Sequence, residues 1–140
     1  MHITVAKDLL ESGSYTCVLT DGTTFFTSKD RGVKPLVQFI EKKDIPQGLF
    51  AADKVVGKAT AYLYVLLKIK ALYAKVISEP AIAVLQSHGI AVSYESKVPN
   101  IINRRGDGIC PFEEAVMGIG DAEAAYAAVL KKMDEMQIRL

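Results

Sequence analysis

The sequence predicts an α/β sandwich of three layers, in which helices cover both faces of a mixed β-sheet. Two observations support this fold class: a hairpin signal in the first third of the chain, and alternating strand-like and helix-like segments in the second half. Of the 140 residues, 50% are hydrophobic and 24% are charged. That balance is typical of a globular chain, and we expect one domain spanning residues 1–140.

The N-terminal third is expected to form a helix, a β-hairpin and a second helix. Residues 2–11 are amphipathic. Residues 15–20 and 23–28 are rich in β-branched and aromatic side chains, and they flank Asp21-Gly22, a dipeptide that favours a tight hairpin turn. A short helix is expected to begin at Pro35, because proline is favoured in the first helical turn.

Residues 51–73 are predicted to form one long central helix. The segment contains no proline, and at 3.6 residues per turn its apolar side chains cover most of the circumference. A helix that is apolar nearly all round belongs in a core. Gly57 costs such a helix roughly 1 kcal/mol relative to alanine, which suggests that another element or a ligand approaches its backbone closely.

The second half predicts two strands separated by a helix. Residues 74–78 form a compact apolar run, Ser78-Glu79-Pro80 is a helix-start signal, and residues 90–96 suit another strand. A strand–helix–strand unit implies a parallel, right-handed crossover. Beyond it we expect a loop, a helix beginning near Pro111, and a final helix capped by Asp121 that runs to about residue 137.

Charge and composition exclude several classes of protein. The formal net charge is +1, so the chain as a whole is not marked as a nucleic-acid or membrane-surface binder. The longest apolar run is far shorter than the roughly 20 residues of a membrane span. The N-terminal residues lack a signal-peptide pattern, and Cys17 and Cys110 are too few for a disulfide framework. We therefore expect a cytoplasmic protein.

Three motifs carry a resemblance to a known family. They are Asp53–Ala59 (DKVVGKA), Ser78–Ala81 (SEPA), and Asn103-Arg104 followed by Cys110–Glu113 (CPFE). With the element order, they make the chain resemble a small family of uncharacterised prokaryotic proteins placed in the cytidine-deaminase-like superfold. The resemblance implies an α/β/α sandwich of cytidine-deaminase-like topology. Because the family has no agreed activity, it implies no reaction.

The zinc chemistry of that superfold is not expected here. Zinc nucleobase deaminases need a His or Cys ligand two residues before a glutamate, and then Pro-Cys-x-x-Cys at a second helix start. In this chain Pro80 is followed by Ala81 and Val84 at the cysteine positions, and His2 and His88 lack ligand spacing. We therefore expect no metal and no cofactor.

The resemblance also implies where a cleft would lie. In such a sandwich the starts of the central helix and of the helix at Pro80 meet at one end of the sheet. Helix N-termini together with lysine suit a phosphate or a carboxylate. Catalysis would use Lys58 as an electrophile or paired with Asp53 or Glu79. Alternatively, Lys54, Lys58 and Lys68 form a solvated stripe. The residues of the expected cleft are Asp53, Lys54, Gly57, Lys58, Ser78 and Glu79.

Cys110 is a third catalytic candidate. The pattern Cys-Pro-x-Glu at a helix start puts the thiol at the N-cap, where the helix dipole and nearby Arg104 and Arg105 would lower its pKa. The thiolate would then act as a nucleophile, while Arg104 and Glu113 would contact a ligand. The alternative is structural: Cys110 is a small N-cap residue and Glu113 closes a capping box.

Two functions remain open from the sequence. In the first, the protein binds a small anionic or nucleotide-like metabolite, and in an enzymatic version it transforms that ligand without a metal. In the second, it is a non-catalytic dimeric scaffold whose lysines are solvated. A homo-oligomer, most simply a dimer, is expected in both cases because the helices are strongly apolar. Convergence of Lys58, Glu79 and Cys110 in one pocket would favour the first function.

Overall fold

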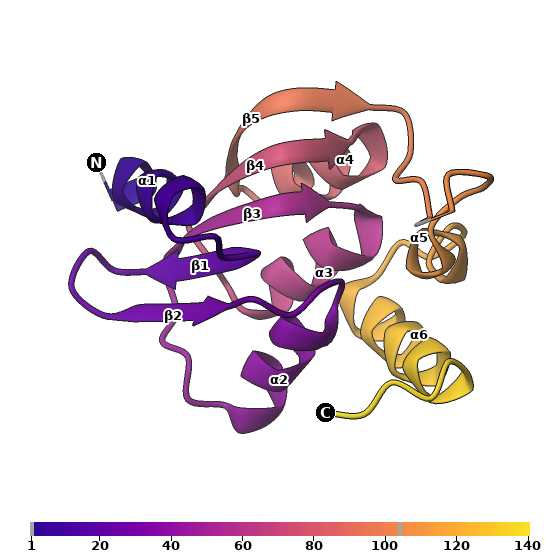
Figure 1. The fold of residues 1–140 in the computed structure, drawn as a ribbon. Helices are drawn as coiled ribbons and strands as arrows, with labels where there is room; N and C mark the ends of the chain where they lie inside the picture. Colours follow the sequence, from indigo (N-terminus) through magenta and orange to yellow (C-terminus); the bar gives the residue numbers. More distant parts are fainter. Residues whose placement is uncertain (1, 104) are drawn as a thin grey trace.

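A five-stranded mixed sheet with the strand order β2-β1-β3-β4-β5 forms the middle of the fold (Figure 1). The computed structural model describes residues 2–103 and 105–140. β1 is antiparallel to both of its neighbours, whereas β3, β4 and β5 are parallel. The strands are β1 (Cys17–Thr20), β2 (Phe25–Ser28), β3 (Phe50–Val56), β4 (Ala71–Ser78) and β5 (Ala91–Val98).

The helices are divided unevenly between the two faces of this sheet. α1 packs alone against β1, β3 and β4 on one face, and α2, α3, α4 and α6 lie on the other side (Figure 1). None of the helices in the described residues is long and apolar enough to cross a membrane. The helices are α1 (His2–Ser12), α2 (Lys34–Lys42), α3 (Lys58–Leu66), α4 (Glu79–Ser87), α5 (Pro111–Ala115) and α6 (Ala122–Glu135).

The larger core surrounds α3, which packs against α2, α4 and α6. Every residue of α3 from Ala59 to Tyr64 is buried, so this helix is in contact with protein on all sides. The sequence therefore predicted a central apolar helix correctly, although it predicted the wrong length. β4 and α4 follow, and Ser78 caps α4 by accepting a hydrogen bond from the N–H of Ala81.

The single helix predicted over residues 51–73 is wrong. The segment contains most of β3, then α3, then the start of β4, with Gly57 as the N-cap of α3. Ala51 and Ala52 favour a helix intrinsically, but they are fully buried between β1 and β4, where pairing on both sides imposes a strand. Lys54 accordingly lies on a strand and Lys68 lies beyond α3, so the proposed helical stripe of lysines does not exist.

The predicted hairpin is confirmed, with shorter strands and a longer turn. β1 and β2 pair from Cys17 with Ser28 to Thr20 with Phe25, which leaves four residues in the turn instead of two. A side-chain oxygen of Asp21 accepts hydrogen bonds from the N–H groups of Thr23 and Thr24, so the aspartate holds the wider turn together.

The smaller core is formed where α1 crosses the sheet. Ala6 and Leu10 of α1 pack against Val18, Ala52 and Tyr73 of the three strands beneath it. Leu10 is only 1% exposed, and a lone helix on a sheet face has few other side chains to share its burial. α1 is therefore held mainly by this small group.

Replacing Leu10 with alanine should destabilise the protein by about 2–5 kcal/mol, because the cavity left on that face has no neighbouring helix to fill it. Urea unfolding followed by circular dichroism measures the change. The control is Val5→Ala, on the exposed side of the same helix, which should change the free energy of unfolding by less than about 1 kcal/mol. Equal effects of the two variants would contradict this account of α1.

Candidate functional site

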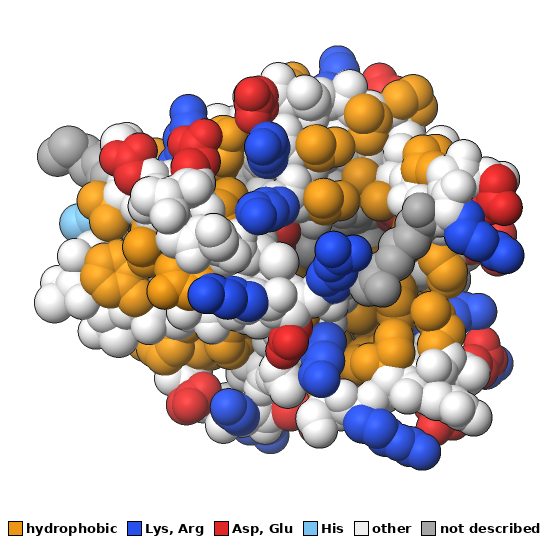
Figure 2. All heavy atoms as spheres, in the orientation of Figure 1, with side chains coloured by type: hydrophobic (Ala, Val, Ile, Leu, Met, Phe, Trp, Pro, Cys, Tyr) orange, Lys and Arg blue, Asp and Glu red, His pale blue; other side chains and the backbone are white. Residues whose placement is uncertain are grey.

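A cavity of about 1050 Å³ lies where β3 ends and α3 begins. In Figure 2, Lys and Arg side chains stand around a hollow whose visible walls include apolar side chains. The lining side chains come from parts of the chain that are far apart in sequence, so the cavity forms only when the tertiary structure is complete. They fall within residues 16–17, 29–36, 53–60, 101–113 and 136–138.

Asp53 lies in the cavity wall and holds two hydrogen bonds. The hydroxyl of Tyr64 donates to one carboxylate oxygen at 2.6 Å, and the backbone N–H of Val55 donates to the other at 3.1 Å. Asp53 as a whole residue is only 9% exposed. Burial raises its pKa to about 7, although both hydrogen bonds act in the opposite direction.

Burial brings the pKa of Asp53 close to neutral pH. A carboxyl with a pKa near 7 exists in both protonation states at neutral pH, which is what a general acid or base requires. Its neighbours cannot supply the proton, because burial raises the pKa of Tyr64 and of Cys17 well above their ordinary values. Asp53 is therefore the titrating member of this buried group.

Glu113 occupies the N-terminus of α3. One carboxylate oxygen accepts a hydrogen bond from the backbone N–H of Lys58 at 2.5 Å, across 55 residues of sequence. Gly57 makes this approach possible, since a Cβ there would lie 2.7 Å from the carboxylate carbon of Glu113. The close backbone approach expected at Gly57 is therefore present, and the neighbouring group is a carboxylate of the protein itself.

This contact also corrects the structural interpretation of Glu113. In a capping box, the glutamate would bond the N–H of Cys110, but that N–H donates to the carbonyl of Ile101 instead. The other oxygen of Glu113 is buried and has no hydrogen-bond partner among the described residues. An unsatisfied buried carboxylate oxygen is costly and is often found where a ligand or a water binds.

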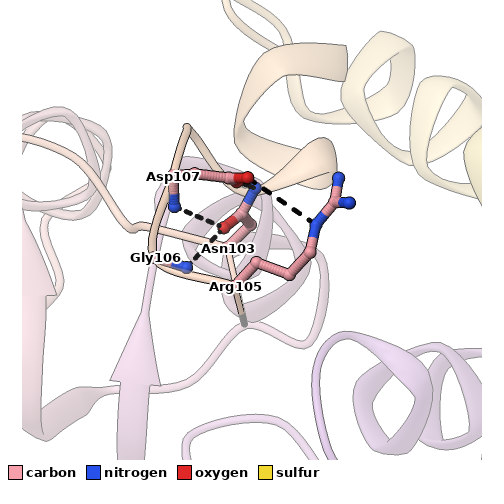
Figure 3. Close-up of polar contacts among 4 residues, drawn as sticks. All are labelled: Asn103, Arg105, Gly106 and Asp107. Atoms are coloured by element: carbon pink, nitrogen blue, oxygen red, sulfur yellow. Dashed lines mark hydrogen bonds and ion pairs between the residues drawn. The ribbon is translucent and has the colours of Figure 1, made fainter.

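A tight loop holds Arg105 beside the cavity (Figure 3). The side-chain oxygen of Asn103 accepts hydrogen bonds from the N–H groups of Gly106 and Asp107, at 2.9 and 3.3 Å, and its amide donates to Asp107. Arg105 also pairs with Asp107 at 3.9 Å, but both side chains are largely exposed, so water weakens this ion pair. Arg105 therefore remains able to meet an anion.

The side chains of the predicted catalytic residues are only partly brought together. Asp53 and Cys110 both line the cavity, as do the predicted ligand-binding residues Lys54, Gly57 and Glu113. The Lys58 ammonium instead donates to the carbonyl of Met117. Cys110 is the N-cap residue of α5 and makes no side-chain cap bond.

Three further predicted site residues lie elsewhere or are not described. Ser78 is fully buried as the cap of α4, and Glu79 is exposed in its first turn. Neither lines the cavity. The prediction for Arg104 falls outside the residues that the structure describes. The convergence of Lys58, Glu79 and Cys110 expected for a catalytic cleft is therefore not seen; of these three, only Cys110 reaches it.

The sequence did not reveal the contribution of the segment after β2. Lys29, Arg31 and Lys34 all line the cavity together with Asp30. The available signal was the spacing of three basic residues within six positions, in a segment that also contains Gly32 and Pro35.

The described residues contain no group of three His, Cys, Asp or Glu side chains that could hold a metal ion. Asp53 and Glu113 are the buried acids of the cavity, and each has a hydrogen bond from the backbone or from a tyrosine. Their carboxyl groups offer hydrogen-bond acceptors in the cavity wall and, at Asp53, a pKa of about 7.

Comparison with known proteins identifies relatives of the chain. A family model described as TM1506, domain of unknown function (DUF1893), matches residues 5–133. The crystal structure of a DUF1893 family protein (TM1506) from Thermotoga maritima, at 2.70 Å resolution, matches with a TM-score of 0.87 and 34% sequence identity. The match covers 94% of this chain and 89% of that chain. No protein with a curated description matches.

Replacing Gly57 with alanine should destabilise the protein by about 1–3 kcal/mol, because the new methyl group displaces the Glu113 carboxylate from the N–H of Lys58. Chemical unfolding measures the loss. Gly118→Ala is the control, since a Cβ at Gly118 meets no atom within 4 Å. In a Glu113→Ala background the Gly57→Ala loss should become smaller. An unchanged loss would contradict the contact as its cause.

Asp53 should make the fold less stable as the pH rises. Its pKa is raised from 3.8 to about 7, so the folded protein binds the proton more tightly, and this stabilisation is lost between these two values. The full effect is roughly 4 kcal/mol, at 1.36 kcal/mol per pKa unit.

Urea unfolding from pH 4 to pH 8 compares the wild type with Asp53→Asn. The wild type should lose about 2–4 kcal/mol relative to the variant over this range. For Asp44→Asn, which changes an exposed acid, the difference from the wild type should stay nearly constant. A constant difference for Asp53→Asn as well would show that this carboxyl does not titrate as described.

Proposed function

The chain belongs to the TM1506 family, a domain of unknown function (DUF1893), and we propose that its cavity binds a small anionic or nucleotide-like metabolite. The observation that carries the proposal is a cavity of about 1050 Å³, whose described lining residues include five basic side chains. Ligand sites in proteins commonly have about 300–1,000 Å³. A nucleotide or a sugar phosphate would therefore fit in this space.

The charged side chains that line the cavity favour the binding of an anion. The described lining residues include five bases and three acids, and burial keeps one of those acids, Asp53, only partly ionised at neutral pH. Positive charge around a concave surface raises the local concentration of anions. The bases are Lys29, Arg31, Lys34, Lys54 and Arg105.

An enzymatic version of this proposal is independent of metal. It assigns proton transfer to Asp53, whose pKa is about 7, and nucleophilic attack to the thiol of Cys110, which lines the same cavity. Lys58 contributes through its backbone N–H, which holds Glu113, and not through its ammonium group. The binding proposal does not depend on this chemistry.

We also infer a cytidine-deaminase-like topology. The support is the element order: a helix, an antiparallel hairpin, and two parallel crossovers through α3 and α4. The zinc of that superfold does not fit the described residues, because Ala81 and Val84 follow Pro80 and no metal-binding group is present among them. The proposed ligand site at the start of α3 is therefore a site without zinc.

The alternative proposal is a non-catalytic dimeric scaffold. The observation in its favour is β5, an eight-residue strand at the edge of the sheet, on which Tyr94 is 43% exposed. Such an edge can pair with a second copy of the chain. A dimer is compatible with both proposals. We also propose a cytoplasmic location, which is supported by the free thiols of Cys17 and Cys110.

A thermal-shift screen with nucleotides, nucleosides, sugar phosphates and small carboxylates tests the binding proposal. A ligand at one hundred times its dissociation constant should add about 2.7 kcal/mol to the free energy of unfolding, which appears as a higher melting temperature. The shift should shrink in Lys54→Ala, at the cavity, and persist in Lys131→Ala, on the exposed side of α6. No shift with any anion would favour the scaffold.

A further inference from the structure

The charged side chains that line the cavity fall into an exposed group and a buried group. Its basic side chains are exposed, apart from the half-buried Lys34, and Asp30 is the one exposed acid among the described lining residues. Asp53 and Glu113 are instead only 9% and 5% exposed. The mouth is therefore basic and the floor is acidic, so the two ends of a bound molecule would meet opposite charges.

The N-terminus of α3 differs from most helix N-termini, because a carboxylate of the protein already occupies it. The start of α3 would normally attract an anion through its free N–H groups and its dipole. Here the Glu113 carboxylate already accepts the N–H of Lys58 and brings its own negative charge to that position. A phosphate placed there would lie beside the Glu113 carboxylate, so the start of α3 opposes a second anion.

Both floor carboxylates retain acceptor capacity. A carboxylate offers about four lone-pair positions. Asp53 uses one for Tyr64 and one for Val55, and Glu113 uses one for Lys58 and leaves its second oxygen without a partner among the described residues. A ligand with N–H or ammonium donors would meet these acceptors.

The walls between the two depths are apolar. Val33, Leu36 and Phe112 are buried, and Ile101 and Pro111 are half-buried around the same space. They would pack against a ring or a short aliphatic chain and exclude water from the floor. A water-poor floor strengthens a hydrogen bond to a carboxylate and leaves an unmatched carboxylate costly.

We propose that the ligand of this cavity carries both charges: a phosphate or carboxylate held by the basic mouth, and an amino group directed inward to Asp53 and Glu113. The inference rests on the proposed function and adds the direction in which the ligand lies. It excludes simple anions, such as inorganic phosphate, as the molecules for which the cavity is built.

Matched pairs of compounds that differ only in the amino group test this inference. Isothermal titration calorimetry compares phosphoethanolamine with ethyl phosphate, and adenosine monophosphate with purine riboside monophosphate. In at least one pair the wild type should bind the amino compound about tenfold more tightly or better, the range expected for a hydrogen bond to a charged acceptor. Inorganic phosphate should bind more weakly than either amino compound.

Two sets of variants separate the floor from the mouth. Glu113→Gln and Asp53→Asn should reduce the preference for the amino compound over the amine-free compound to less than about threefold. Lys54→Ala should weaken both members of a pair by the same factor, and Lys131→Ala should change neither. The wild-type comparison needs no variant, so it stands even if Glu113→Gln folds poorly.

The outcomes distinguish the inward amino group from the proposed anion site on which this inference rests. If both members of every pair bind equally and Lys54→Ala weakens them, the anion site stands and the inward amino group is wrong. If no phosphorylated compound binds, the proposed function fails and the inference fails with it.

Discussion

The hydrogen bond from the N–H of Lys58 to Glu113 joins two segments that lie 55 residues apart in the sequence and that both border the cavity. It fixes α5 against the start of α3, where Gly57 leaves just enough space for the carboxylate. This position explains several features together: an extended glycine before a core helix, a buried acid, and a wall made from the segment around Cys110. Without the contact, α5 would have no polar anchor on α3 among the described residues.

Asp53 and Glu113 both carry the desolvation cost of a buried acid, and the structure offsets that cost differently at each. Asp53 is desolvated, and the cost is relieved by a tyrosine hydroxyl, a backbone N–H and partial protonation near pH 7. Glu113 is relieved on one oxygen by a helix start and is left unsatisfied on the other. A protein built only for stability would replace such groups with apolar side chains. Their position beside a large cavity is the main structural argument for a function there.

The sequence predicted elements with strong local signals and missed elements that only tertiary pairing creates. The hairpin around Asp21, the caps at Ser78 and Asp121, and the proline-led helices follow from local chemistry. β3 was missed because Ala51 and Ala52 carry no strand signal and become a strand only between β1 and β4. The same limit applies to the site. Asp53, Lys54, Gly57, Cys110 and Glu113 were predicted from motifs, and in the structure they line the cavity. Lys29, Arg31 and Lys34 line the same cavity only because the chain folds.

The cavity wall is drawn from segments between Thr16 and Ile138, which nearly span the described chain. A molecule bound there would act as a non-covalent crosslink among the hairpin, the start of α3, the loop before α5 and the C-terminal segment. Occupancy would therefore slow cleavage by proteases at sites remote from the ligand, because opening any one of these segments would first require its release. Metabolite level and protein lifetime would then be linked through the fold itself.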